Sequence, residues 1–412
     1  MSGTQRRAAA GLTAKIGDQV FTEITRFSVA RDLQNIAGTF EVTVVDEARV
    51  KDALLAKIGL SPKNPAIKAG DAISFAIDGE PALVGWIDVP HFTWKGDRIE
   101  CQLTGRDKTG DLVECAALPS GPAEFRGVDL LYVAKKVCEP YGIVVKADVD
   151  IGAPFERLAL HKHQTALTFL ESAARQRSVL LVSDGVGGLL LTRGGSSRGP
   201  SPLRIGFEIQ DVDVRFDWTK RFSDYFVTQD SSKKRSGGPA LDSTVVPVTG
   251  APAPLDEPGA ASEDEAASIG TMGHAKDPDV KRWRPTVRLT RSQSGMDTVQ
   301  EQAEWMARVA KGESDKVVFQ VLEWRAGEKK ELWRPNQVVA VTEPYSGISR
   351  DMLIAGVTFQ YDEEGRRTRL RVAGVTAYDR INEAERSRGN RGHRGRHGAG
   401  ALDSTVVPLT AR

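Results

Sequence analysis

The chain has 412 residues, of which 40% are hydrophobic and 27% are charged, and its formal net charge is +1. This length allows two or three domains with cores of their own, and the composition is that of an ordinary soluble globular protein. A charge so close to neutral excludes a general attraction of the whole chain to nucleic acid or to a membrane surface.

The N-terminal sequence MSGTQRRAAAG has two arginines but no apolar run after them, so we predict no signal peptide. No apolar stretch approaches the ~18 residues that span a bilayer. The three cysteines lack metal-ligand spacing and predict no disulfide framework, and we therefore expect folding in a reducing cytoplasm.

Residues 1–117 are predicted to form a first β domain, because apolar and polar residues alternate with a period of two. Phe40, Val42 and Val44, for example, would share one face of a strand while the residues between them face the other way. Several short strands with regular turns between them favour a small barrel or a sandwich.

A β-hairpin pattern occurs twice, at residues 83–105 and 353–374. In each copy one glycine opens the outgoing strand, one lies in the turn and one closes the return strand. The return arms are equally long, and the outgoing arms differ by two residues, which keeps every side chain on its own face of the sheet. The chain therefore carries one sheet module twice, unless two common glycine-punctuated hairpins coincide by chance.

Residues 118–203 are predicted to form a small α/β domain. Asp129 is the expected N-cap of a first helix, which Pro140 and Gly142 end. Thr165 is the expected N-cap of a second helix. Two strands follow, and we interpret the glycines between them as a hairpin turn rather than a nucleotide-binding loop.

The second β domain is expected in two pieces, residues 204–230 and 283–380. Between them, residues 231–282 are rich in Ser, Gly, Pro, Ala and acidic residues, and are predicted to be a flexible insertion. Within the second piece a helix is expected to begin at Asp297 and to end before Gly312. This domain holds the second copy of the hairpin pattern.

Residues 381–412 are predicted to be a flexible tail rich in arginine and glycine. Its segment ALDSTVVP, residues 401–408, repeats residues 240–247 letter for letter. Each copy is short, β-branched and ends in proline, which suits addition to the sheet edge of a partner. The predicted partner-binding residues are the apolar positions of the copies: Leu241, Val245, Val246, Leu402, Val406 and Val407. The alternative is a recent local duplication without a docking role.

No catalytic, cofactor-binding or metal-binding residue is predicted. The motifs of serine hydrolases, zinc proteases and phosphate-binding loops are absent from the sequence. His161 and His163 would share one face of a strand, but no third ligand has a related spacing. Carboxylate pairs such as Asp362 and Glu363 fall at expected turns, where solvated acids are the default. We therefore predict that the chain is not an enzyme and uses no cofactor.

The segment GRDKTGDLVECA, residues 105–116, directly follows the first hairpin. Together with residues 27–44, residues 69–88 and the helix that follows, it resembles the baseplate hub proteins of phage Mu-type contractile tails, the tail protein P family. The likeness covers most of residues 20–220 and, more weakly, residues 283–380.

This resemblance implies an α+β, mainly β fold, with two small related β-barrels flanking the α/β domain in each subunit of a homotrimeric ring. One face of the ring would continue the six-fold tail tube, and the other would seat the trimeric central spike. The expected partners are the tube protein, the spike protein and other baseplate proteins, but no membrane and no specific nucleic acid. The expected location is the tail baseplate of a virion assembled in the host cytoplasm.

Other functions remain open from the sequence. One is the equivalent hub of a tailocin, a gene-transfer particle or another phage-derived injection machine. A second, from a different class, is a tail-associated peptidoglycan hydrolase, although no catalytic pair is identified for it.

Overall fold

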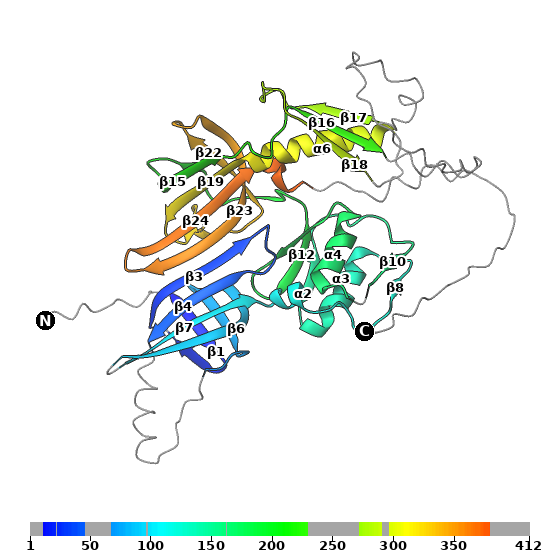
Figure 1. Cartoon of the computed structure of the whole chain (residues 1–412). Helices are drawn as coiled ribbons and strands as arrows, with labels where there is room; N and C mark the ends of the chain where they lie inside the picture. Colours follow the sequence, from blue (N-terminus) through cyan, green and yellow to red (C-terminus); the bar gives the residue numbers. More distant parts are fainter. Residues whose placement is uncertain are drawn as a thin grey trace, which may run out of the picture.

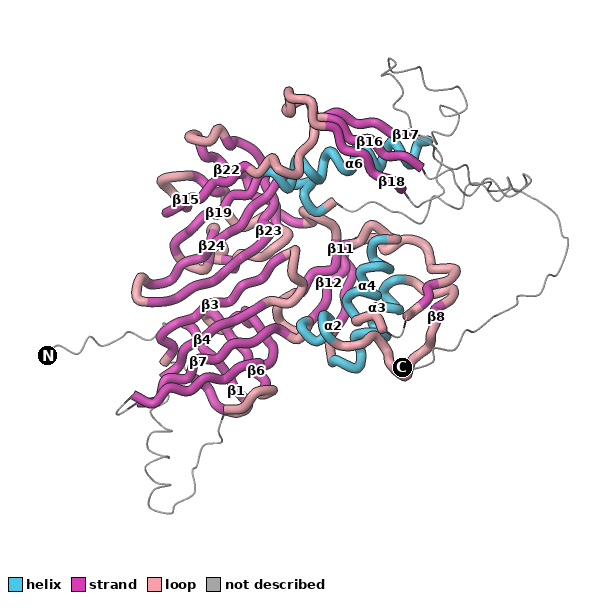
Figure 2. Tube along the Cα trace, in the orientation of Figure 1, coloured by secondary structure: helices cyan, strands magenta, loops and turns pink. Residues whose placement is uncertain are grey.

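The computed structural model of the chain describes residues 11–21, 23–45, 67–95, 98–161, 163–229, 272–290 and 296–379. The fold is mainly β, with two sheet units stacked on one side of the molecule (Figure 1). Figure 2 shows that the helices lie on the other side, in an α/β domain and beside a small separate sheet. Among the described residues, no helix is both long enough and apolar enough to cross a lipid bilayer.

The N-terminal region is built from strands, as its period-two pattern predicts. Phe40, Val42 and Val44 are all buried on one face. Their neighbours are less buried, so the alternation follows the pleat of an antiparallel strand. The strands are β1 Leu12–Ile16, β2 Gln19–Phe21, β3 Ile24–Asp32, β4 Thr39–Val45, β5 Ala72–Ile77, β6 Glu80–Lys95 and β7 Arg98–Asp107.

The α/β domain has a hydrophobic core of its own around its two main helices. The predicted N-caps are confirmed: the Asp129 side chain accepts a hydrogen bond from Tyr132 N at 2.7 Å, and Thr165 accepts one from Thr168 N at 3.2 Å. The elements are α2 Gly110–Glu114, β8 Glu124–Phe125, α3 Leu130–Cys138, η1 Glu139–Tyr141, β9 Val144–Ala147, β10 Leu158–Ala159, α4 Ala166–Arg175, β11 Leu180–Ser183 and β12 Gly188–Thr192.

The C-terminal region returns to strands, and its longest strand, β23, makes pairs along its whole length. The elements are β13 Ser197–Arg198, β14 Leu203–Arg204, β15 Ile209–Phe216, β19 Asp315–Leu322, β20 Arg325–Ala326, β21 Glu331–Leu332, β22 Gln337–Glu343, β23 Ile348–Asp362, β24 Gly365–Gly374 and η3 Val375–Tyr378.

A small three-stranded sheet with one helix is inserted between β15 and β19. Its elements are β16 Asp224–Gln229, β17 Met272–Lys276, β18 Pro285–Thr290 and α6 Met296–Ser314. The prediction of a flexible insertion up to residue 282 is wrong for its last part, because β17 pairs with β16. The expected helix end is also wrong: Gly312 lies inside α6, where the missing Cβ lets the backbone of Ala377 approach closely.

The two closed barrels that were expected are not found among the described residues. Instead, both strand-rich regions join in one 14-stranded sheet, whose main path runs β15-β19-β24-β23-β3-β4-β7-β6-β5-β1-β2. One hydrophobic core runs through both halves of this sheet. The reason is the pairing of β3 with β23, which links regions that lie far apart in the sequence.

Candidate functional site: the duplicated sheet unit and the junction between its copies

The two halves of the large sheet share one topology. In the N-terminal unit the strands lie in the order β3-β4-β7-β6-β5, and in the C-terminal unit in the order β15-β19-β24-β23-β22. If the strands of each unit are numbered along the chain, both orders are 1-2-5-4-3, and every pairing is antiparallel. The same sheet is therefore built twice, as the repeated hairpin pattern predicts.

The register of the two hairpins is also shared. The last pair of β6 and β7 is Lys95–Arg98, and the last pair of β23 and β24 is Asp362–Gly365. Each outgoing strand has one bulge, and the two bulges lie equally far from these last pairs, at Asp88 in β6 and at Ala355 in β23. Counting from the bulge therefore matches each position of the first hairpin with its counterpart in the second.

The closing glycines that suggested the repeat are not counterparts of each other. Gly105 pairs with Ile87 just before the first bulge, whereas the residue that pairs with Ile354 just before the second bulge is Val372. Each closing glycine meets a local need: a Cβ on Gly105 would lie 2.0 Å from Trp86 O, and a Cβ on Gly374 would lie 2.7 Å from Gly312 Cα. The repeated hairpin is thus confirmed by pairing and bulges, and its glycine spacing was a misleading guide.

A backbone contact beside each bulge is repeated as well. The N–H of Gly70 donates to Ile87 O at 2.8 Å, and the N–H of Asn336 donates to Ile354 O at 2.9 Å. Both donors have left-handed backbones, with φ of +88° for Gly70 and +70° for Asn336. Glycine and asparagine are among the residues that adopt this conformation most readily. The duplication therefore extends to the turn before the third strand of each unit.

The two units meet along one antiparallel strand pair, residues 27–32 of β3 with residues 356–361 of β23. β22 pairs with the same edge of β23, but only as far as Leu353. Along this edge, β23 therefore pairs first with β22 and then with β3. The pairing buries its apolar face: Phe359 is 1% exposed and the opposite Val29 is fully buried. This junction is therefore part of the protein core.

Aromatic side chains continue the core across the junction. Phe27 makes an edge-to-face contact with Phe75 of its own unit, with ring centroids 5.4 Å apart. It makes a second such contact with Trp324 of the C-terminal unit, at 5.8 Å. Pairs of this kind contribute about 0.5–1.5 kcal/mol each beyond their buried area. Trp324 Nε1 also donates to Gln360 O at 2.9 Å, which fixes the indole over β23.

Arg325 adds a polar bridge between the two units. Its guanidinium donates to Glu80 at 2.8 Å, to Asp78 at 3.2 Å and to the Ile77 carbonyl at 2.9 Å. Arg334 reaches Glu80 from the same side, at 3.1 Å. A network around one partly buried arginine has more effect than an isolated surface ion pair, because one ordered side chain serves several partners.

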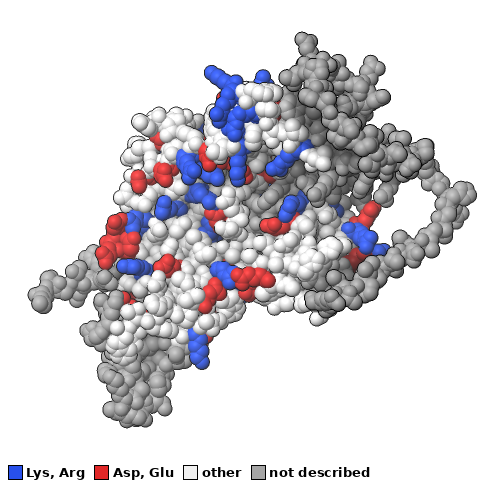
Figure 3. Space-filling view, in the orientation of Figure 1, with Lys and Arg blue, Asp and Glu red and all other residues white. Residues whose placement is uncertain are grey.

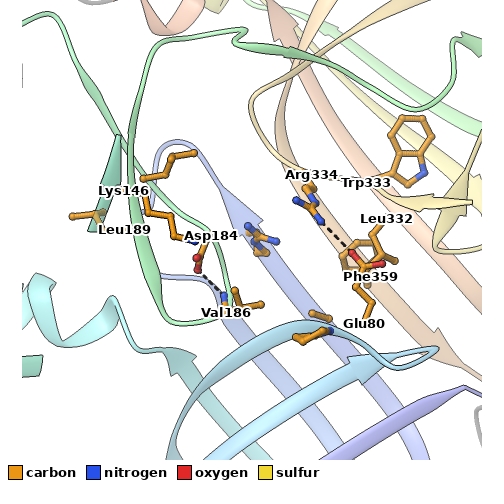
Figure 4. Close-up of a pocket in the computed structure, with 13 residues that line it drawn as sticks. Glu80, Lys146, Asp184, Val186, Leu189, Leu332, Trp333, Arg334 and Phe359 are labelled. Carbon is orange, nitrogen blue, oxygen red and sulfur yellow. Dashed lines mark hydrogen bonds and ion pairs between the residues drawn. The ribbon is translucent and has the colours of Figure 1, made fainter. Parts of the chain in front are cut away.

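Arg31 of β3 lies where both units meet the α/β domain. It lines a cavity of about 340 Å³ together with other charged residues, Glu80, Lys146, Asp184 and Arg334. Figure 4 shows these side chains converging from separate elements, with the Arg334–Glu80 ion pair on one wall. Burial lowers the pKa of Arg31 to about 10, so the guanidinium stays charged at neutral pH. Charges of both signs thus meet in this cavity, whose lining comes from both sheet units and from the α/β domain.

The motif GRDKTGDLVECA covers the point where β7 passes into α2. Asp107 is 1% exposed, and its carboxylate accepts hydrogen bonds from Thr109 Oγ1 at 2.6 Å and from Thr109 N at 3.0 Å. It also accepts one from Ser183 Oγ of β11 at 2.6 Å. Burial raises the pKa of Asp107, while these hydrogen bonds and Arg31 act in the opposite direction. The motif thus fastens the N-terminal unit to the α/β domain.

The partner-binding residues predicted from the repeated octapeptide lie outside the described residues: Leu241, Val245, Val246, Leu402, Val406 and Val407. The His161 and His163 rings stack on each other with centroids 5.8 Å apart, and both are exposed. The described residues contain no group of three or more side chains placed to hold a metal ion. Sequence reasoning missed the contact of Asp107 with Ser183, since nothing local signals a partner in another domain.

Charges of both signs are scattered over the face of the molecule seen in Figure 3. Several arginine–carboxylate pairs join neighbouring elements of the chain.

Family models match the chain in three places. "Mu phage baseplate assembly protein GpP-like, N-terminal" matches residues 12–107, "Baseplate hub protein gp44-like, second domain" matches residues 109–193, and "Mu phage baseplate assembly protein GpP, fourth domain" matches residues 295–380. The first and last matches contain the two repeated hairpins, and the middle one contains the α/β domain. The chain belongs to the Mu-type baseplate hub proteins.

Relatives of full length support this assignment. The chain is 26% identical over 403 residues to the baseplate hub protein gp44 of Escherichia phage Mu, covering 96% of this chain and 95% of that protein. The 43 kDa tail protein of prophage MuSo2 from Shewanella oneidensis is 26% identical, with a TM-score of 0.71 over 90% of this chain and 99% of that one. A tail protein from Neisseria meningitidis MC58, 18% identical, shares the fold, with a TM-score of 0.64 over 89% of this chain and 98% of that one. The predicted resemblance is confirmed, and the chain is a baseplate hub protein of a phage tail.

Proposed function

We propose that this baseplate hub protein assembles as a homotrimeric ring that adapts the six-fold tail tube to the three-fold central spike. The duplicated sheet unit carries the proposal. Three subunits with two units each would present six similar sheets on the tube side. The α/β domain and the small inserted sheet each occur once in the described part of the chain, so a trimer would present three of each.

The way in which the two units meet also favours a ring. β3 of one unit contacts β23 of the other, so the junction joins two different edges of the same kind of unit. A contact between two unlike edges can be repeated from one unit to the next, head to tail. The repeats close into a ring when the rotation from one unit to the next is a whole fraction of a full turn. Closure after three subunits would place six units in one ring.

The proposed role is structural rather than enzymatic. The relatives are named as baseplate and tail proteins, and the cavity at Arg31 is lined by charges of both signs, including the Arg334–Glu80 ion pair. The proposed neighbours are the tube, spike and other baseplate proteins, in a virion tail assembled in the host cytoplasm. Of the predicted domain limits, residue 380 is kept as part of this proposal. The limits at 117 and 203 are moved to the start of α2 and the end of β12, because Leu112 of α2 lies in the α/β core and β13 pairs with β22.

The repeated octapeptide extends the same proposal. Two copies per chain, residues 240–247 and 401–408, would give six arms in a trimer. We propose that the arms dock by strand addition on six-fold components around the hub, where Pro247 and Pro408 end the addition because they lack an amide donor. Deletion of one copy should halve the arms and weaken tail assembly. Normal assembly without both copies would contradict the docking role.

The mass of the assembled protein tests the ring. Native mass spectrometry of the full-length 44.7 kDa chain should show a trimer. A species that remains monomeric or dimeric under assembly conditions would overturn the proposal, and so would a closed tetramer. Zymography on cell-wall material should show no lytic band, and a clear band would overturn the structural role.

A further inference from the structure

The internal junction joins β3 of the N-terminal unit to β23 of the C-terminal unit. The counterpart of β3 in the C-terminal unit and the counterpart of β23 in the N-terminal unit take no part in it. The strand pairings identify these edges. Leu103 and Leu370 are counterparts in the two return arms. In the N-terminal unit, Leu103 pairs with Val42, and Val42 pairs with Phe27 of β3. In the C-terminal unit, Leu370 pairs with Phe319, and Phe319 pairs with Val212 of β15. β15 therefore stands in its unit where β3 stands in the other.

The second open edge follows from the bulges of the hairpins. Residues 356–361, which pair with β3, begin directly after the bulge of β23. The residues that begin directly after the bulge of β6 are 89–94. Residues 89–94 are therefore the counterpart of the edge that the internal junction uses.

Both counterpart edges lack a neighbouring strand in the described part of the chain. Among the named strands, β15 pairs with β19 alone, and its first residue, Ile209, forms an isolated bridge with Ile205. β5 pairs with β6 no farther than Trp86, so no described strand lies along the outer edge of residues 89–93. Within the described residues, two unlike edges are therefore left without a neighbouring strand, and they correspond to the two edges joined inside the molecule.

Side-chain exposure differs between the junction and its open counterparts. Phe359 is 1% exposed, whereas its counterpart Phe92 is 44% exposed. Ala355 at the second bulge is also 1% exposed, whereas Asp88 at the first bulge is exposed. On β15, Phe216 is 48% exposed. The aromatic side chain at this position is therefore buried in the junction, at Phe359, and exposed at its counterpart Phe92, beside which no second unit is described.

We propose that β6 of one subunit pairs antiparallel with β15 of the next copy of this chain, in the register of the internal junction. The register of β3 with β23 sets the expected pairs: Phe92 opposite Val214, His91 opposite Arg215, and Pro90 opposite Phe216. The first and last of these pairs lie on the apolar face, where Phe92 and Phe216 would lose contact with water.

Pro90 fits an edge that has one specific partner. Proline removes one amide donor from the strand, so an open edge that carries it is a poor template for indiscriminate pairing. The remaining backbone groups and the apolar face would then select the complementary edge of β15. The inference rests on the proposed ring, because each subunit would use both of its open edges once and six junctions would close the circle.

Engineered disulfides test the pairing in the full-length chain. The exposed native thiol is first removed by Cys115→Ser. His91→Cys and Arg215→Cys are then combined, because opposite residues of paired strands lie within the Cα separation of about 4.4–6.8 Å that a disulfide needs. Mild oxidation should give covalent dimers and trimers on non-reducing gels, and reductant should reverse them.

Two matched variants set the scale. Ala30→Cys with Thr358→Cys occupies the corresponding pair of the internal junction and should give a cross-link that leaves the chain monomeric on the gel. His91→Cys with Asp213→Cys is displaced by two residues, or roughly 7 Å along the strand, and should cross-link at most one-tenth as well. Equal cross-linking of the displaced and in-register pairs would refute the register.

Native mass measurement separates the two levels of the proposal. A trimer in which the in-register pair does not cross-link, while the internal control does, would refute the β6–β15 contact and leave the ring intact. A chain that stays monomeric would refute the ring itself. Phe92→Glu offers a second readout: we expect a monomer whose far-UV circular dichroism matches the wild type. A stable trimer of this variant would also overturn the proposed contact.

Discussion

Replacement of Asp107 by alanine should loosen the attachment of the N-terminal unit to the α/β domain. The carboxylate accepts three hydrogen bonds from buried groups, two from Thr109 and one from Ser183. Hydrogen bonds to a charged group contribute about 1.5–3 kcal/mol each, and the cost of burying the carboxylate offsets part of that sum. We expect Asp107→Ala to lower the free energy of unfolding by about 3–5 kcal/mol. Asp107→Asn should cost less because its amide keeps an acceptor oxygen.

Urea unfolding of the full-length chain, followed by tryptophan fluorescence and circular dichroism, measures this effect. Glu114→Gln is the matched control, since Glu114 lies in the same motif but is exposed and pairs with Arg106 at the surface. Its loss should leave the free energy of unfolding nearly unchanged, because solvent screens an exposed ion pair. An Asp107→Ala variant as stable as this control would refute the role of the motif as a fastening between domains.

The pH dependence of stability gives an independent check. Burial raises the pKa of Asp107 in the folded chain above its unfolded value, which is about 3.9 for aspartate. The folded chain therefore holds this proton more tightly than the unfolded chain does. The wild type should gain stability relative to Asp107→Asn as the pH falls towards the pKa that Asp107 has in the unfolded chain. It should lose this stability as the pH rises through the pKa that Asp107 has in the folded chain. Parallel pH profiles would contradict this reasoning.

Three further substitutions test the sheet and its junction. Gly105→Ala would place a Cβ 2.0 Å from Trp86 O and should cost about 3 kcal/mol or more in thermal unfolding, whereas Gly194→Ala, with no atom nearer than 3.7 Å, should be tolerated. Arg325→Ala removes the hydrogen bonds to Asp78, Glu80 and Ile77 O, and should lower the free energy of unfolding by about 1–3 kcal/mol. Arg325→Lys should recover only part of this stability, because an ammonium group cannot reproduce the fork of the guanidinium. Full recovery by lysine would contradict the role of Arg325 as a donor to several partners at once. Phe359→Ala should lower the free energy of unfolding by about 3–5 kcal/mol, because Phe359 is buried. Phe92→Ala should weaken trimer formation and barely change the free energy of unfolding of the monomer. If both variants destabilise the monomer equally, Phe92 is a core residue.

Local features were readable from the sequence because their causes are local. Asp129 and Thr165 were predicted as helix caps, and both side chains accept hydrogen bonds from amides three residues ahead. Alternation of polar and apolar residues placed Phe40 and its neighbours on the buried face. Gly312 shows the limit of such rules. Glycine usually ends a helix, but here it stays inside α6 because the backbone of a distant residue, Ala377, packs against it.

By itself, then, the sequence determined the mainly β character, the helix caps, the repeated hairpin and the family resemblance. Only the tertiary structure decided which strands are neighbours. A period of two states which face of a strand is buried, but it does not state which edge it pairs with. The pairing of residues 27–32 with residues 356–361 merged two expected barrels into one continuous sheet. The contact of Asp107 with Ser183 was fixed in the same way, because long-range partners are chosen by packing in three dimensions.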